Sequence, residues 1–168
     1  MSDDHPACLP VEKLLDQCEV RHERRSGPGG QHRNKVSTAI VITHPPTGVK
    51  AEANERRSQA ENLRAAVRRL RVRLAVEVRS RTPNSMASEL WRSRVSGKRL
   101  SINPEHDDFP ALLAEALDVV VAAEYDLSAA ANTLDVSASQ LLKFLQEELA
   151  AGTAVNEARR QRGLRPLH

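Results

Sequence analysis

The residues of this chain that could take part in chemistry gather in one glycine-rich segment, Arg25-Ser26-Gly27-Pro28-Gly29-Gly30-Gln31-His32-Arg33-Asn34-Lys35. Three glycines and a proline within four positions predict a loop, because glycine adopts backbone angles that other residues avoid and proline fixes its own. Gln31 adds one neutral amide, which can donate and accept hydrogen bonds. Cations flank it on both sides. Such a loop suits contact with a polyanion better than a self-contained acid–base site.

Two common glycine-rich loops do not fit this segment. A P-loop needs a glycine followed directly by Lys and Ser or Thr, whereas Lys35 follows Asn34 and precedes Val36. A dinucleotide-binding loop needs a glycine at the position that His32 occupies. An ordinary surface turn stays open as an explanation of the loop taken by itself.

Three blocks in and after the loop resemble the signature of class I peptide chain release factors, whose Gly-Gly-Gln domain hydrolyses peptidyl-tRNA on the ribosome. The first block is residues 25–40, and the other two are Ile42-Thr43-His44-Pro45-Pro46-Thr47-Gly48 and Glu55-Arg56-Arg57-Ser58-Gln59-Ala60-Glu61-Asn62. The likeness covers roughly residues 19–80. Arg33 departs from it, because the family has a small aliphatic residue two positions after the glutamine; the change adds charge to the base of the loop.

The resemblance implies that Gly29, Gly30 and Gln31 are the catalytic residues. In the family the glutamine backbone N–H faces the departing ribose oxygen, the side chain helps to admit water, and the glycines let the N–H turn inward. The resemblance also implies N-methylation of Gln31 by a glutamine methyltransferase. The spacing of Cys8 and Cys18, and that of the histidines, does not match a metal site, so we expect no metal, and we expect no cofactor. The implied partners are the ribosome, through its large-subunit rRNA, and peptidyl-tRNA.

The charges along the chain are strongly segregated. Residues 21–100 hold 19 Lys/Arg against 6 Asp/Glu, whereas residues 101–150 hold one lysine against 10 acids. A basic block of this size indicates a nucleic-acid binder. All four aromatic residues lie after residue 90, so we expect contacts with phosphate and ribose and not with stacked bases. The residues expected to bind RNA are Arg24, Arg25, Ser26, His32, Arg33, Asn34, Lys35, Arg56, Arg57, Ser58, Gln59, Asn62, Arg64 and Arg68.

The elements that would position the loop follow from hydrophobic patterning. A short helix over 10–17 precedes a strand over 19–25, and the β-branched run at 38–43 predicts a buried strand. A turn at 45–48 leads into a returning strand at 49–53. A long helix over 58–80 follows, where Ser58 with Glu61 matches a capping box, although Asn54 could cap an earlier start.

The long helix carries two adjacent stripes. Apolar residues recur from Leu63 to Leu74 at helical spacing, and Arg64, Arg68 and Arg71 lie beside them. Like charges at this spacing cost a few tenths of a kcal/mol per pair in an isolated helix, which a polyanionic partner would offset. The alternative is a solvated face whose arginine stems cover the edge of the core, and either explanation could hold for Arg69 and Arg73.

These patterns predict an α+β fold, with a small β-sheet packed on a long helix and a small all-helical C-terminal region behind it. Residues 1–82 would form the Gly-Gly-Gln catalytic domain and 83–108 a connector. Residues 109–150 would form an acidic helical region, with helices at 109–123, 128–133 and 137–149. Residues 151–168 would form a basic C-terminal tail.

The organisation of the chain also suggests how it works. Only about 18 residues precede the first strand, whereas class I release factors carry a separate codon-reading domain, so we expect codon-independent release on stalled ribosomes. With no long apolar run and no secretory signal, we expect a cytoplasmic monomer without membrane contact. Two alternatives stay open: a non-catalytic ribosome- or RNA-binding adaptor, and a DNA binder, since residues 127–137 resemble a helix-turn-helix core. The negative charge of that region speaks against DNA.

Overall fold

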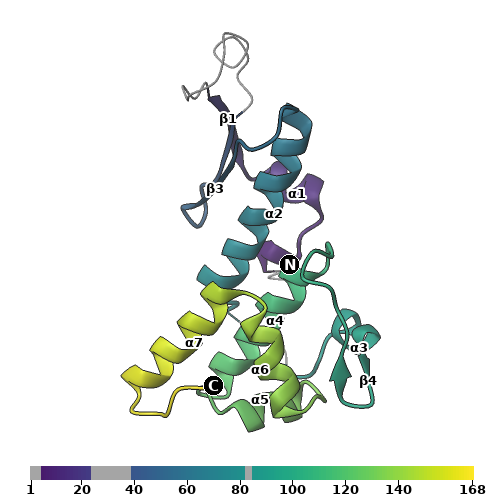
Figure 1. Cartoon of the computed structure of the whole chain (residues 1–168), viewed down its shortest axis with the longest axis vertical. Coiled ribbons are helices and arrows are strands. Elements are labelled where there is room, and N and C mark those ends of the chain that lie inside the picture. The colour runs from purple at the N-terminus through teal and green to yellow at the C-terminus, as the bar shows by residue number, and fades with distance from the viewer. Residues whose placement is uncertain (1–4, 24–38, 82–84) are drawn as a thin grey trace.

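A three-stranded antiparallel sheet forms one end of the molecule (Figure 1). The structure is a computed structural model, and it describes residues 5–23, 39–81 and 85–168. After a short 3-10 helix, η1 (Pro6–Cys8), and helix α1 (Val11–Leu15), the chain forms β1 (Glu19–Glu23), β2 (Ala39–His44) and β3 (Val49–Ala53) in the order β1-β2-β3. The residues between β1 and β2 lie outside the described ranges.

The two buried strands owe their place to their patterning. Ile40 and Ile42 of β2 are fully buried, and β3 alternates buried and exposed residues along its length. Gly48 closes the turn between them with a φ of 74°, a conformation that glycine adopts without strain. β1 is exposed along its whole length, because helix α2 packs mainly on β2 and β3. β1 is therefore an edge strand that can carry a loop without being part of the core.

Helix α2 (Gln59–Glu77) packs against both the three-stranded sheet and the C-terminal helices. Its 19 residues span about 28 Å at about 1.5 Å per residue. The hydroxyl of Ser58 accepts a hydrogen bond from the Glu61 backbone N–H at 3.4 Å, so Ser58 caps the helix as predicted. The sheet lies along its N-terminal part, and helices pack around its C-terminal part (Figure 1).

Four helices form the other end of the molecule: α4 (Phe109–Ala122), α5 (Leu127–Thr133), α6 (Ala138–Gln146) and α7 (Leu149–Gln161). α4 is buried on nearly all sides and packs against α2, so one hydrophobic core runs from the sheet into this region. The predicted α+β fold, a small sheet on a long helix followed by a helical region, is confirmed. None of the helices in the described ranges has both the length and the apolar character needed to cross a membrane.

The segment predicted as a connector, 83–108, is more ordered than its sequence indicates. It contains helix α3 (Glu89–Arg94) and a two-stranded sheet of β4 (Val95–Ser96) and β5 (Arg99–Leu100). Trp91 of α3 is fully buried, and its indole N–H donates to the Leu134 carbonyl at 2.8 Å. Its ring meets Phe144 edge-on at 5.7 Å. This segment is part of the helical core.

The C-terminal residues also differ from the prediction of a basic tail. The helix expected over 137–149 ends at Gln146, and α7 runs on to Gln161. Beyond α7 the chain folds back, where the Asn156 side chain bonds both the N–H and the carbonyl of Leu167, at 2.7 and 3.1 Å. Most of the predicted tail is therefore helical, and the residues after α7 are held to that helix at Leu167 and at the Arg165 carbonyl, which accepts from Arg159 at 2.8 Å.

Candidate nucleic-acid interface

The register of the sheet places the ends of three strands together. Glu23, the last residue of β1, pairs with Ala39, the first of β2, and Ala53 at the end of β3 pairs with Ile40. The chain therefore leaves β1, re-enters at β2 and passes into the segment before α2 at one end of the sheet, far from α4–α7 (Figure 1). We call this end, with residues 54–64, the tip.

Most of the predicted site residues belong to the segment between β1 and β2. Its bounds are set by the Glu23–Ala39 pair, so the segment begins and ends at the tip. The residues predicted there lie outside the described ranges, and their roles stay predictions: Arg24, Arg25, Ser26, Gly29, Gly30, Gln31, His32, Arg33, Asn34 and Lys35.

The remaining predicted cations of the tip are available to a partner. Arg56 and Arg57 follow β3, and Arg64 lies in the second turn of α2; all three are exposed. Within the described residues their side chains make no hydrogen bond and no ion pair. Ser58 is half-buried and serves as the α2 cap, and Gln59 beside it is exposed. Among the residues that the structure describes, the tip thus presents three positive charges without a partner.

Asn62 does not fit the predicted RNA contact. It is fully buried, its side-chain oxygen accepts from the Arg56 N–H at 2.9 Å, and its side-chain N–H donates to the Arg56 carbonyl at 2.9 Å. A buried amide with these partners cannot also reach a phosphate. Asn62 instead fixes the backbone from which the Arg56 side chain projects, so its role is to position Arg56.

Arg68 is likewise engaged within the protein. Its guanidinium donates to the Pro104 carbonyl at 2.5 Å and forms an ion pair with Glu105 at 3.1 Å. Its Nε is buried and has no hydrogen-bond partner in the described part of the chain. The predicted RNA contact of Arg68 is therefore not supported by this arrangement, in which the side chain ties α2 to the segment before α4.

Other arginines of α2 bind the sheet. Arg69 donates to the Glu52 carbonyl at 2.7 Å and pairs with Glu55 at 2.6 Å. The hydrogen bond from Arg69 to the Glu55 carboxylate is the main reason that the pKa of Glu55 falls to about 2. Hydrogen bonds from the Glu55 and Asn54 backbone N–H groups lower this pKa further. Arg73 donates to the Lys50 carbonyl and pairs with Glu77 at 2.8 Å. This side of α2 is thereby clamped onto β3.

The arginines at and beyond the middle of α2 bind the helical end. Arg71 donates to the carbonyls of Ala7 and Asp107, at 3.1 and 2.8 Å, and burial lowers its pKa. Arg79, just after α2, forms an ion pair at 3.1 Å with Asp118 of α4, which is 8% exposed. Burial also lowers the pKa of Arg79, opposed by Asp118. The predicted like-charge stripe is thus satisfied internally from Arg68 onward, and only Arg64 stays open.

Two buried histidines brace the opposite end of the sheet. His44 lies between the Thr47 hydroxyl at 2.8 Å and the Gln17 side-chain oxygen at 3.2 Å, and burial lowers its pKa. His5 contacts the Val78 carbonyl at 3.0 Å, and burial lowers its pKa as well. Both line a cavity of about 440 Å³. They hold η1, α1 and the β2–β3 turn against the end of α2.

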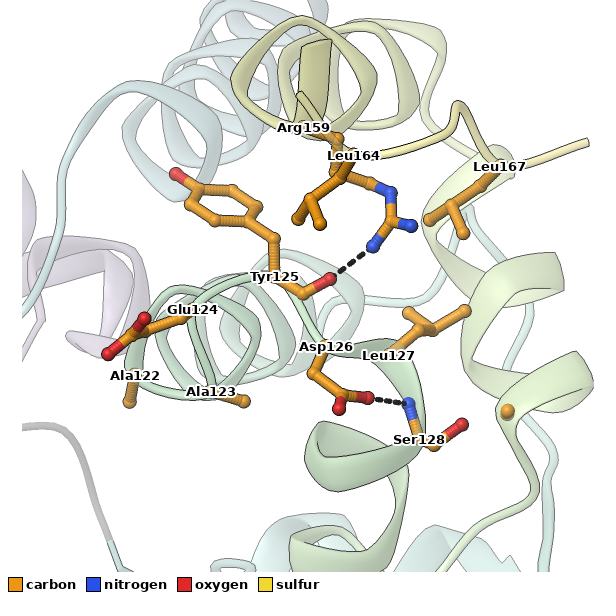
Figure 2. Close-up of a pocket in the computed structure, with 11 residues that line it drawn as sticks. Ala122, Ala123, Glu124, Tyr125, Asp126, Leu127, Ser128, Arg159, Leu164 and Leu167 are labelled. Carbon is orange, nitrogen blue, oxygen red and sulfur yellow. Dashed lines mark hydrogen bonds between the residues drawn. The ribbon is translucent and has the colours of Figure 1, made fainter. Parts of the chain in front are cut away.

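A cavity of about 840 Å³ lies where the end of α4 meets α5 and the C-terminal residues (Figure 2). Two of its polar side chains are engaged with the backbone. Asp126 accepts from the Ser128 N–H and Arg159 donates to the Tyr125 carbonyl (Figure 2), and Asp126 also accepts from the Ala129 N–H and so caps α5. The guanidinium of Arg162 lies 4.4 Å from the centre of the Tyr125 ring. The cavity therefore offers structural contacts and no catalytic constellation.

Comparison with known proteins identifies the half of the chain that carries the tip. A family model described as the RF-1 domain matches residues 13–104, more than half of the chain. This chain belongs to the RF-1 domain family. The predicted resemblance to the class I release factors is confirmed, and the match extends beyond the predicted residues 19–80 to include the second half of α1, all of α3 and the β4–β5 hairpin. Helices α4–α7 lie outside the matched range.

Curated relatives agree with the RF-1 domain match. The chain is 38% identical over 96 residues to peptide chain release factor 1 of Lactiplantibacillus plantarum, which is 56% of this chain and 27% of that protein. It is 42% identical over 72 residues to the Streptococcus agalactiae protein of that name, covering 42% and 20%, and 44% identical over 66 residues to that of Ureaplasma parvum, covering 38% and 18%. The matched part spans about a quarter or less of these relatives.

Proposed function

We propose that this chain promotes hydrolysis of the ester between nascent peptide and tRNA on the ribosome, with Gln31 at the reacting bond. Membership of the RF-1 domain family is the observation that carries the proposal. The relatives matched over this part are named peptide chain release factors. Gly29 and Gly30 would allow the Gln31 backbone N–H to face the departing ribose oxygen, while the Gln31 amide admits water. Gln31 would also be the acceptor of a methyl group from a glutamine methyltransferase.

The charges of the tip support a ribosomal RNA partner. Arg56, Arg57 and Arg64 are exposed and unpaired within the described residues, and they lie at the end of the sheet where the Gln31 segment begins and ends. Arginine side chains suit phosphate groups, because the guanidinium presents several donors in a fixed fork. These side chains would hold the tip against rRNA while Gln31 approaches the peptidyl-tRNA ester.

We propose further that release by this chain does not depend on the codon. Reading a single-stranded codon relies on stacking and on hydrogen bonds to base edges. Trp91, Phe109 and Phe144 are buried, and Tyr125 is half-buried under Arg162. None of the Trp, Phe and Tyr side chains of this chain therefore offers an exposed stacking platform. Contacts with phosphate, which carry no sequence information, would dominate.

Peptide release from stalled ribosomes tests this function. Complexes with peptidyl-tRNA are prepared with a stop codon, a sense codon or no mRNA in the decoding site, and released peptide is measured over time. We expect similar release rates on all three, and a loss of roughly 100-fold or more in Gln31→Ala with ribosome binding retained. Gln161→Ala, which removes an exposed amide at the end of α7, should release normally.

Each other outcome has a distinct meaning. Release confined to the stop-codon complex would contradict codon independence and leave the chemistry in place. Binding without release on any complex would favour a non-catalytic adaptor. Loss of ribosome binding in Gln31→Ala would remove the catalytic assignment of Gln31.

A further inference from the structure

Helices α5 and α6 form a rigid pair joined by the short turn 134–137. Asp135 in this turn has a φ of 52°, and its N–H donates to Asn132 at the end of α5. The buried Trp91 donates to the Leu134 carbonyl at 2.8 Å and packs edge-on against Phe144 of α6. The turn is thus held from inside the core, and the outer side of α6 stays open to solvent.

The β4–β5 hairpin lies beside the start of α6. Its two connecting residues, Gly97 and Lys98, have φ values of 54° and 62°, and a tight hairpin turn of type I′ requires two such residues. The Lys98 carbonyl accepts a hydrogen bond from the Ser137 N–H, the cap residue of α6, at 3.2 Å. A residue from the basic block is therefore fixed at the first turn of a helix in the acidic region, some forty residues later in the sequence.

These elements share a group of unpaired cations. Arg92 of α3, Lys98 and Arg99 of the hairpin and Lys143 of α6 are all exposed. None of these four side chains makes an ion pair or a hydrogen bond within the described residues. The acids on the same elements that also lack such partners are Glu89, at the start of α3, and Asp135. These adjoining elements therefore carry four such cations against two such acids, and we call the exposed part of α3, the β4–β5 hairpin and α6 the hairpin surface.

The net charge of residues 101–150 overstates the repulsion that a phosphate would meet here. Of the ten acids in that segment, three form ion pairs with arginines that lie outside it, and these pairs offset their negative charge. The pairs are Glu105–Arg68, Asp108–Arg94 and Asp118–Arg79. The charges that remain available to a partner are more evenly matched than the sequence indicates.

We propose that the hairpin surface is a second nucleic-acid-binding site, which holds the phosphate backbone of an RNA double helix. A helix start with a basic hairpin at its side presents cations and polar groups at different points along a duplex. Since the aromatic residues of this region are buried or covered, the surface does not read bases by stacking. The choice of RNA over DNA rests on the proposed ribosomal function. The surface would dock the helical end on rRNA while the tip reaches the peptidyl-tRNA.

Binding of the whole chain to a 20-base-pair RNA duplex tests the proposal without ribosomes. Fluorescence anisotropy is measured over a series of salt concentrations for the original chain and for Lys98→Gln/Arg99→Gln. We expect about tenfold weaker binding in the variant. We also expect the slope of log K against log salt to fall by about 2, one for each lost phosphate contact. Lys13→Gln/Arg165→Gln removes two exposed cations from α1 and the C-terminal segment and should bind like the original chain.

The outcomes separate this proposal from its rivals. Unchanged binding in Lys98→Gln/Arg99→Gln, or an equal loss in the control variant, would overturn the hairpin surface. Tighter binding to a DNA duplex of the same sequence would overturn the assignment to RNA. Gln31→Ala should bind the duplex normally. The duplex-binding result can therefore be interpreted even if the chain releases no peptide, and the peptide-release result can be interpreted even if the chain does not bind the duplex. Unchanged circular dichroism and melting temperature exclude unfolding as the cause of a loss.

Discussion

The two ends of helix α2 use the same residue type in opposite ways. Arg64, near the tip, is exposed and unpaired within the described residues, whereas Arg71 and Arg79 donate to backbone carbonyls and to Asp118 at the helical end. The sequence shows one continuous basic helix. The fold divides it into a part that is open to a partner and a part that binds its own acidic helices.

This difference has an electrostatic cause. A buried or half-buried guanidinium loses hydration and must find its own acceptors, as the lowered pKa of Arg79 reflects. An exposed guanidinium keeps its water until a partner replaces it. The acidic helical end therefore takes up the arginines in the C-terminal part of α2, whereas the tip and the hairpin surface keep exposed cations for an external partner.

Breaking the ion pair at the helical end should give the largest effect on stability. Arg79→Leu leaves the Asp118 carboxylate buried with only the Ser80 N–H as a charge-stabilising donor, so we expect a loss of about 3 kcal/mol in the free energy of unfolding. Arg64→Leu, at the open part of α2, should change it by less than about 0.5 kcal/mol. Urea unfolding monitored by circular dichroism measures both.

The double variant Arg79→Leu/Asp118→Leu sharpens this test. It removes the stranded charge, so it should recover part of the loss seen in Arg79→Leu. Equal effects of Arg79→Leu and Arg64→Leu would mean that the two parts of α2 do not differ as their contacts indicate.

The long elements of the fold could be predicted from the sequence. The β-branched run at 38–43 and the periodic stripe of the long helix each lie within a few residues of β2 and α2, because both patterns repeat over several residues. α3 and the β4–β5 hairpin could not, since six residues and two-residue strands hold too few repeats. The Trp91 indole donates to the carbonyl of Leu134, which lies 43 residues later in the sequence. No local sequence pattern indicates such a contact.

The roles of the polar residues were harder to predict. Arg64 and Arg68 look alike in the sequence, and only the approach of Pro104, 36 residues later, distinguishes them. Asn62 is predicted above to contact RNA together with the basic residues around it. Its spacing of four from Ala66, itself four from Leu70, already placed it on the buried face of α2, and that signal would have indicated a structural role.

Removing the Asn62 side chain should have the next largest effect and should reach the tip. Asn62→Ala leaves the Arg56 N–H and carbonyl without their buried partner, so we expect a loss of about 2 kcal/mol in unfolding free energy. It should also weaken ribosome binding, because Arg56 is no longer held in place. Asn132→Ala, on the exposed side of α5, is the matched control. Weaker ribosome binding at unchanged stability would instead point to a direct RNA contact.

The smallest predicted effect is a pH dependence at the junction between sheet and helical end. The ring Nδ1 of His5 accepts from the Ala7 N–H at 3.1 Å, so its Nε2 carries the proton that is donated to Val78. A second proton on Nδ1 would oppose the Ala7 N–H, and burial already lowers the pKa of His5 from its ordinary value of 6.5. The neutral ring is therefore the form that the fold prefers.

The sign of the pH effect follows from the unfolded chain. There His5 takes up a proton near its ordinary pKa, before the folded chain does, so the unfolded state binds more protons and stability falls as the pH drops below about 6.5. We expect about 1 kcal/mol less stability at pH 5.5 than at pH 7.5 from this residue. His5→Asn should reduce that difference, and His168→Gln at the exposed C-terminus should not. If the pH dependence persists in His5→Asn, it arises from His44, because burial lowers the pKa of His44 as well.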